Sequence, residues 1–191
     1  METDQHSVEL VDDTVVRQFA RAALLAALMG VASMIPIPIS AVPGTMQLLV
    51  VFLAGLFLGP VWGTLSMVFY LGAGALGAPV FAGMNGGFGY LLGNTGGFLL
   101  SFPVGALLVG AVVHRGRTVR DPAETTLPVL LCALAAATVV VYLAGFSWFA
   151  WVTETTLAES FTVVTLPLIP GDLLKIAAAV AIVKSGRIDP T

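Results

Sequence analysis

Hydrophobic residues gather in six blocks along this chain, and glycine, proline or polar residues separate the blocks. A helix needs about 20 predominantly apolar residues to cross the hydrocarbon core of a bilayer, and most of the blocks approach or exceed that length. The pattern therefore predicts an all-α integral membrane protein with six transmembrane helices. The predicted spans are 22–39, 46–58, 61–76, 88–113, 127–152 and 163–183.

The second and third predicted spans are short for transmembrane helices. Gly59-Pro60 lies between them, and this dipeptide is a turn signal because proline cannot continue a regular helix. We expect two separate crossings here. A tilted hairpin or a partly re-entrant element is the alternative.

Composition supports the membrane class. The 191 residues are 58% hydrophobic and 10% charged, with a mean hydropathy of +0.98, whereas about 25% of the residues in a soluble domain are charged. The net charge of −3 says little, because acidic residues concentrate near the N-terminus. We expect an acidic cytoplasmic tail over 1–18, a six-helix membrane domain over 19–187 and a short tail over 188–191. The acidic start and the late first apolar block argue against a cleavable signal peptide.

Basic residues outside the spans fall in three clusters. Lysine and arginine favour cytoplasmic loops, so all three clusters lie inside only if even numbers of crossings separate them. Six helices with both termini cytoplasmic meet this condition. The clusters are Arg17 and Arg21 before the first span, Arg115, Arg117 and Arg120 after the fourth, and Lys184 and Arg187 after the sixth.

Two ionisable residues, Asp172 and Lys175, lie inside the last predicted span. A charge in this position costs several kcal/mol unless it is paired or solvated. Because residues three apart share one face of a helix, the two side chains can converge. The pair predicts a polar site within the membrane. An ion pair that only stabilises helix packing is the alternative.

Two connections on the side opposite the basic clusters are unlike ordinary linkers. Segment 36–47 carries three prolines and ends with Thr45 and Gln47, which can form hydrogen bonds. Segment 77–90 is rich in glycine and aromatic residues. Irregular backbone at membrane depth is tolerated where it lines a cavity. We therefore expect these outer loops to cap a ligand cavity as a lid.

Several familiar motifs do not indicate a nucleotide, phosphate or metal site in this sequence. The match to G-x-G-x-x-G at 72–77 ends an apolar helix rather than following a strand, so helix packing explains it better. The sequence has no phosphate-binding G-x-x-x-x-G-K-[ST] loop. His6 and His114 have no metal-ligand spacing, and Cys132 is the single cysteine. We expect no catalytic residue, metal, cofactor or nucleic-acid partner.

Four alanines in the first span are spaced for close helix packing. They form two overlapping A-x-x-x-A pairs, which leave a flat stripe where another helix can approach. A partner protein and internal packing are equally good explanations. The residues are Ala22, Ala23, Ala26 and Ala27.

Five ordered sequence blocks resemble the BioY family, the biotin-specific substrate-binding (S) components of energy-coupling factor (ECF) transporters. The resemblance extends from the first span to the sixth. Gly44 and Asn94 depart from the usual family pattern and affect loop shape rather than polar groups assigned to the ligand. The blocks are VPGTMQ at 42–47, LAGLFLGP at 53–60, PVFAG at 79–83, GFGYLLGNTGG at 87–97 and PGDLLK at 170–175.

The resemblance implies a biotin pocket that opens outward and is closed by the first and third outer loops. It leaves open whether Asp172 or Lys175 contacts the ureido ring or the carboxylate. The implied ligand contacts are Asn85, Tyr90, Asp172 and Lys175, with Thr45 and Gln47 as lid residues and Phe81 and Phe88 as an apolar wall.

The resemblance also implies partners and a location. A biotin-binding component of the cell membrane would work with two ECF ATPase subunits and a transmembrane coupling subunit, which would dock on the alanine stripe. Three alternatives remain: an S component for another vitamin, a stand-alone facilitator or channel, and an intramembrane enzyme. The enzyme is least supported, because Asp172 has no second catalytic group beside it.

Overall fold

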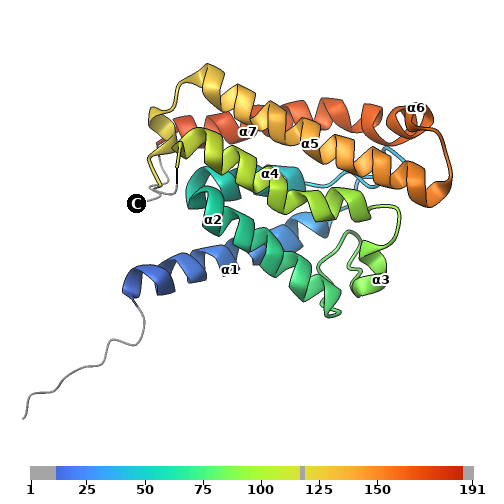
Figure 1. Cartoon of the computed structure of the whole chain (residues 1–191), viewed down its shortest axis with the longest axis horizontal. Helices are drawn as coiled ribbons and strands as arrows, with labels where there is room; N and C mark the ends of the chain where they lie inside the picture. Colours follow the sequence, from blue (N-terminus) through green and yellow to red (C-terminus); the bar gives the residue numbers. More distant parts are fainter. Residues whose placement is uncertain (1–11, 117–118, 187–191) are drawn as a thin grey trace, which may run out of the picture.

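The computed structural model describes residues 12–116 and 119–186, and every regular element within these ranges is helical. Figure 1 shows the long helices packed side by side, with connecting loops gathered at two opposite ends. Several features predicted from sequence lie outside the described residues. They are the first part of the acidic tail, His6, Arg117, Arg187 and the segment 188–191.

Helix α1 (Asp13–Ser33) begins and ends earlier than the predicted span. The Asp12 carboxylate accepts a hydrogen bond from Thr14 N at 2.7 Å, which satisfies a free N–H at the helix start and lowers the pKa of the Asp12 carboxyl. The predicted end at residue 39 is wrong, because Pro36 and Pro38 cannot continue a helix. Helix α1 also includes residues 13–18, which the sequence assigned to the tail.

The first outer loop, residues 34–46, folds back on itself. Ile37 N donates to Gly44 O at 2.8 Å, and Gly44 N donates to Ile37 O at 2.9 Å. Farther along the loop, Ala41 N donates to Val163 O at 3.4 Å. These bonds fix a compact segment rather than an open connection.

Helix α2 (Gln47–Ala75) reverses direction at Gly59, whose φ of 72° is favourable for glycine. Gln47 Nε2 lies 2.6 Å from Tyr70 Oη across 23 residues, a separation that a straight helix would stretch to about 34 Å. Helix α2 is therefore a hairpin of a first arm (47–58) and a second arm (60–75). The turn predicted at Gly59-Pro60 is confirmed.

Glycines let α2 pack closely against helix α4 (Gly96–His114). A Cβ added at Gly55 would lie 2.6 Å from Ala106 O, and one added at Gly110 would lie 2.5 Å from Pro60 N. These are contacts between backbones, which side-chain rotation cannot relieve. The small residues therefore set the distance between the two helices.

His114 caps the first arm of α2. Its Nε2 lies 3.2 Å from Gly55 O and 3.0 Å from Leu56 O, and Arg120 N donates to its Nδ1 at 3.1 Å. Since a backbone N–H can only donate, Nδ1 is the acceptor and Nε2 carries the proton of a neutral ring. Pro60 has no N–H to offer Leu56 O, and the imidazole takes its place.

The predicted fourth span begins too early, whereas the fifth is accurate. Residues 88–95 form the short helix α3 (Phe88–Leu91) and a turn before α4 begins. Trp148 Nε1 fixes this turn by donating to Gly93 O at 2.9 Å. Helix α5 (Leu127–Thr153) follows the predicted 127–152 closely.

The last span begins earlier than predicted and has an irregular first half. Helix α6 (Leu157–Ser160) leads into a π-helical turn (Phe161–Thr165), a 3₁₀ turn (Leu166–Leu168) and helix α7 (Ile169–Lys184). Irregular turns of this kind often mark functional sites within helices. At the far end, Lys184 Nζ donates at 2.7 Å to the carbonyls of Ala123 and Thr125.

Within the described ranges, five helices are long and apolar enough to cross a membrane, with α2 counted once and Leu157–Lys184 taken as one. In Figure 1 the loop 34–46, the loop 76–95 and the α5–α6 connection lie at the same end of the molecule. The Gly59 turn, the α4–α5 connection and the end of α7 lie at the opposite end.

Candidate binding pocket

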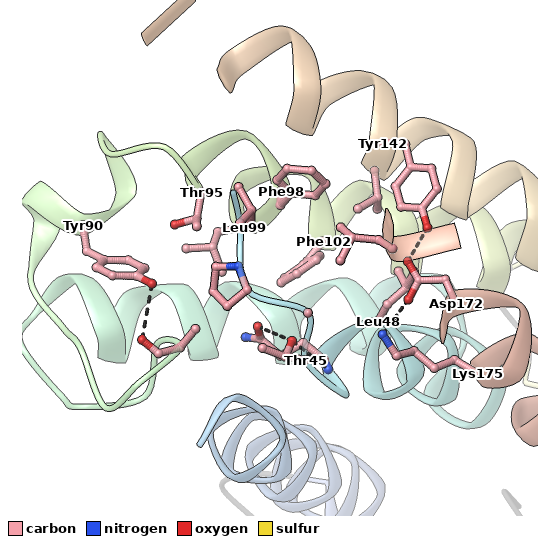
Figure 2. Close-up of a pocket in the computed structure, with 17 residues that line it drawn as sticks. Thr45, Leu48, Tyr90, Thr95, Phe98, Leu99, Phe102, Tyr142, Asp172 and Lys175 are labelled. Carbon is pink, nitrogen blue, oxygen red and sulfur yellow. Dashed lines mark hydrogen bonds and ion pairs between the residues drawn. The ribbon is translucent and has the colours of Figure 1, made fainter. Parts of the chain in front are cut away.

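A pocket of about 560 Å³, including its mouth, lies beneath the loops 34–46 and 76–95. Helices α2, α4, α5 and α7 form its walls (Figure 2). The lining residues are Val42, Pro43, Gly44, Thr45, Gln47, Leu48, Ala82, Tyr90, Thr95, Phe98, Leu99, Phe102, Val141, Tyr142, Leu168, Asp172 and Lys175.

The charged end of the pocket contains the pair predicted from sequence. Lys175 Nζ lies 2.5 Å from Asp172 Oδ1, so the predicted convergence of the two side chains is confirmed. The hydroxyl of Tyr142, on α5, donates to the other oxygen, Asp172 Oδ2. Asp172 is only 5% exposed. Both carboxylate oxygens are therefore engaged, as a buried charge requires.

The apolar wall comes mainly from α4. Phe98, Leu99 and Phe102 project toward the middle of the pocket in Figure 2. Gly145 on α5 makes room for the first of these rings, because a Cβ there would lie 2.3 Å from Phe98. The wall is positioned by close packing of α4 against α5.

Thr45 and Gln47 lie where the first outer loop enters α2. Thr45 Oγ1 donates to Gln47 Oε1 at 2.8 Å, and Gln47 Nε2 donates to Tyr70 Oη at 2.6 Å. Val42, from the same loop, is buried over the pocket. The loop thus lies over the cavity and contributes polar groups to its lining.

The Tyr90 end of the pocket lies far from the charged pair in Figure 2. Tyr90 Oη donates to Ala82 O at 3.3 Å, and Asn85 Nδ2 donates to the same carbonyl at 2.7 Å. Phe81 is fully buried and stacks on Tyr90 with ring centroids 5.2 Å apart. Asn85 and Phe81 therefore support Tyr90 from outside the lining.

Five of the eight predicted contacts line the pocket: Thr45, Gln47, Tyr90, Asp172 and Lys175. Asn85, Phe81 and Phe88 do not. Phe88 is 64% exposed, and the α4 side chains occupy the wall proposed for it. Hydropathy does not reveal which side of an almost uniformly apolar helix faces a cavity.

Sequence reasoning missed Tyr142, which binds Asp172. A usable signal exists, because a buried tyrosine hydroxyl normally finds a hydrogen-bond partner and Tyr142 stands in an otherwise apolar stretch of α5. Its partner is 30 residues away in the sequence, so the spacing gives no indication of the contact.

The four alanines of α1 do not share one environment. Ala22 is fully buried and Ala26 packs against the core. Ala23 and Ala27 are exposed on the outer side of the helix. Only the second A-x-x-x-A pair is open to another helix.

Comparison with known proteins supplies relatives along most of the chain. The model of the BioY family matches residues 3–188. A "Probable biotin transporter BioY" of Pyrococcus horikoshii is 40% identical over 166 residues, covering 87% of this chain and 93% of that protein. The "Biotin transporter BioY" of Rhodobacter capsulatus is 36% identical over 167 residues, covering 81% and 83%.

A solved structure has the same fold. It is the crystal structure at 2.1 Å of the S-component for biotin from an ECF-type ABC transporter. Its TM-score is 0.81 at 26% sequence identity, and the match covers 93% of this chain and 94% of that chain.

Proposed function

Because the chain belongs to the BioY family, we propose that it is the biotin-binding membrane component of a vitamin uptake system. As a family member it is a multi-pass membrane protein of the transporter class. The observation that carries the proposal is the buried Asp172–Lys175 pair, held by Tyr142 in the wall of a loop-covered pocket. The match to an S-component for biotin supports the same ligand.

The charged end of the pocket fits the ureido ring of biotin. The ring is neutral, with two N–H donors and one carbonyl acceptor, and the valerate chain carries the carboxylate. Asp172 and Lys175 together are close to neutral, so a carboxylate placed there would bring two anions against one cation. Asp172 accepts from one ureido N–H group, and Lys175 donates to the ureido carbonyl beside it. Such charge-assisted hydrogen bonds are strong in a dry pocket.

The rest of the ligand fits the remaining walls. The apolar thiophane ring lies against Phe98, Leu99 and Phe102. The carboxylate then extends toward the Tyr90 end, where Thr95 also lines the pocket. Thr95 immediately precedes α4, and the start of a helix carries partial positive charge that favours an anion.

The six-crossing topology belongs to the proposal. Each arm of α2 accounts for one crossing, since the chain reverses at Gly59. The basic residues Arg115 and Lys184 lie at the ends of α4 and α7, opposite the loops that cover the pocket (Figure 1). The positive-inside tendency then makes the loop end external and both termini cytoplasmic.

ECF ATPase subunits and a transmembrane coupling subunit are the proposed partners, in keeping with the match to an ECF-type S-component. Helix α1 is the proposed docking element, because only 17% of its 18-residue apolar stretch is buried within the molecule. The exposed Ala23–Ala27 pair allows a partner helix to approach closely. Ala22 and Ala26 instead pack α1 against its own chain.

Equilibrium binding of radiolabelled biotin to the detergent-purified chain tests the function. The protein is expected to bind biotin saturably and one-to-one, and Asp172→Asn or Lys175→Ala is expected to abolish tight binding. Thr138→Ala is a matched control, since this buried α5 hydroxyl bonds only within its own helix, to Leu134 O at 2.8 Å. A folded wild type that binds another vitamin but not biotin would overturn the ligand assignment.

A further inference from the structure

A continuous row of buried contacts lies behind the pocket and joins its two covering loops. Gln47, the first residue of α2 after the first loop, donates through Nε2 to Tyr70 Oη at 2.6 Å. The Tyr70 ring meets Phe81, in the covering loop 76–95, edge to face at a centroid distance of 5.5 Å. Phe81 in turn stacks on Tyr90 at 5.2 Å with an interplanar angle of 18°.

The end members of the row line the pocket, whereas Tyr70 and Phe81 do not. Both inner side chains are almost completely buried. Nothing in the binding pocket therefore explains why a polar hydroxyl is placed in the core at Tyr70. The Tyr70 oxygen accepts its hydrogen bond from the lid residue Gln47, whose amide oxygen in turn accepts from Thr45 at 2.8 Å.

The packing around the row leaves little freedom. A Cβ added at Gly74 would lie 2.1 Å from Phe81 Cζ, so the ring occupies the space that a side chain would fill. The Gln47 amide has its oxygen and nitrogen bound to different partners, which fixes its orientation. Close-packed interiors transmit a displacement to their neighbours rather than absorbing it.

The end of α1 touches both loops as well. Ser33 Oγ donates to Val80 O at 2.6 Å, and Met46 N donates to Ala32 O at 3.3 Å. Helix α1 thus anchors the first loop and the second loop at neighbouring residues. The two loops are therefore joined in two ways: by their shared contacts with α1 and by the row of buried side chains.

We infer that Tyr70 and Phe81 are positioning residues that hold Gln47 and Tyr90 in register, so that the two covering loops become ordered together around the ligand. The inference rests on the proposed function. Loss of the Tyr70 hydroxyl is then expected to disturb both covering loops, although Tyr70 does not line the pocket.

The test uses the full chain with two spin labels, one in each loop. Ala41 and Met84 are exposed and are changed to cysteine in a Cys132→Ser background. Distance distributions are measured with and without biotin, alongside the Kd and dissociation rate for biotin. Tyr70→Phe removes only the hydroxyl, Phe81→Leu removes the stacking, and Thr138→Ala is the control for loss of a buried hydroxyl.

Tyr70→Phe and Phe81→Leu are both expected to broaden the interloop distance distribution and to raise the Kd for biotin about 5- to 50-fold, chiefly through faster dissociation. Thr138→Ala is expected to change neither. A Kd within twofold of wild type together with an unchanged distribution in Tyr70→Phe and Phe81→Leu would overturn the inference. If one variant does not fold, the other decides. If the wild type does not bind biotin, the proposed function is wrong. The interloop distance distributions measured without ligand then test the inference by themselves.

Discussion

The hydroxyl of Tyr142 donates a hydrogen bond to Oδ2 of Asp172, linking α5 to α7 across the charged end of the pocket. Lys175 occupies the other carboxylate oxygen. The bond fixes the rotation of the carboxylate and so determines which of its lone pairs face the cavity. Tyr142 therefore orients the Asp172 carboxylate and leaves its charge unchanged.

Tyr142→Phe is therefore expected to weaken biotin binding without removing any charge. A buried group left without its partner costs about 1–3 kcal/mol, which corresponds to roughly 5- to 150-fold in Kd. Equilibrium binding to purified protein measures the effect. An unchanged Kd in a variant that elutes and melts like wild type would show that Lys175 alone orients the carboxylate.

His114 is expected to contribute to stability rather than to binding. His114→Leu leaves the carbonyls of Gly55 and Leu56 without the imidazole donor, at about 1–3 kcal/mol for an unsatisfied buried group. His114→Gln keeps a donor and is expected to recover part of the loss. Thermal unfolding in detergent measures both variants. A large change in biotin Kd with unchanged melting would contradict this role.

Gly110, at the α2–α4 contact, and Gly72, at an open position of α2, offer a matched pair of substitutions. Gly110→Ala forces a Cβ to within 2.5 Å of Pro60 N, whereas an alanine at Gly72 meets nothing within 4 Å. We expect Gly110→Ala to lower the melting temperature and the yield of monodisperse protein sharply. Gly72→Ala is expected to be neutral or to stabilise by up to about 1 kcal/mol, since alanine favours the helix. Equal behaviour of the two variants would refute the proposed close approach.

Bulky residues on the exposed alanine pair are expected to separate binding from uptake. Ala27→Leu extends into the space where a partner helix would pack and is expected to reduce biotin uptake by the assembled transporter at least tenfold with an unchanged Kd. Ala22→Leu, at a fully buried position, is expected to damage the fold itself. Copurification with the coupling subunit and uptake by reconstituted vesicles provide the readouts. Normal copurification of Ala27→Leu would remove this face from the docking proposal.

The sequence predicted those features that depend on local spacing. Asp172 and Lys175 meet because they are three residues apart on one helix, and Gly59-Pro60 turns the chain because of its own backbone chemistry. The end of the first span and the start of the fourth differ from the prediction because the outer loops that adjoin them are themselves apolar. Tyr142 was missed because its contact depends on how α5 packs against α7.

We propose that the Asp172–Lys175 pair holds the ureido ring and not the carboxylate of biotin. Competition binding of biotin and of its primary amide to wild type and to Lys175→Ala tests it most directly, because the amide keeps the ureido ring and lacks the negative charge. If the pair holds the ureido ring, Lys175→Ala weakens the binding of both ligands by the same factor and leaves the ratio of their affinities unchanged. A loss of biotin affinity at least tenfold larger than the loss of amide affinity would instead place the carboxylate at Lys175.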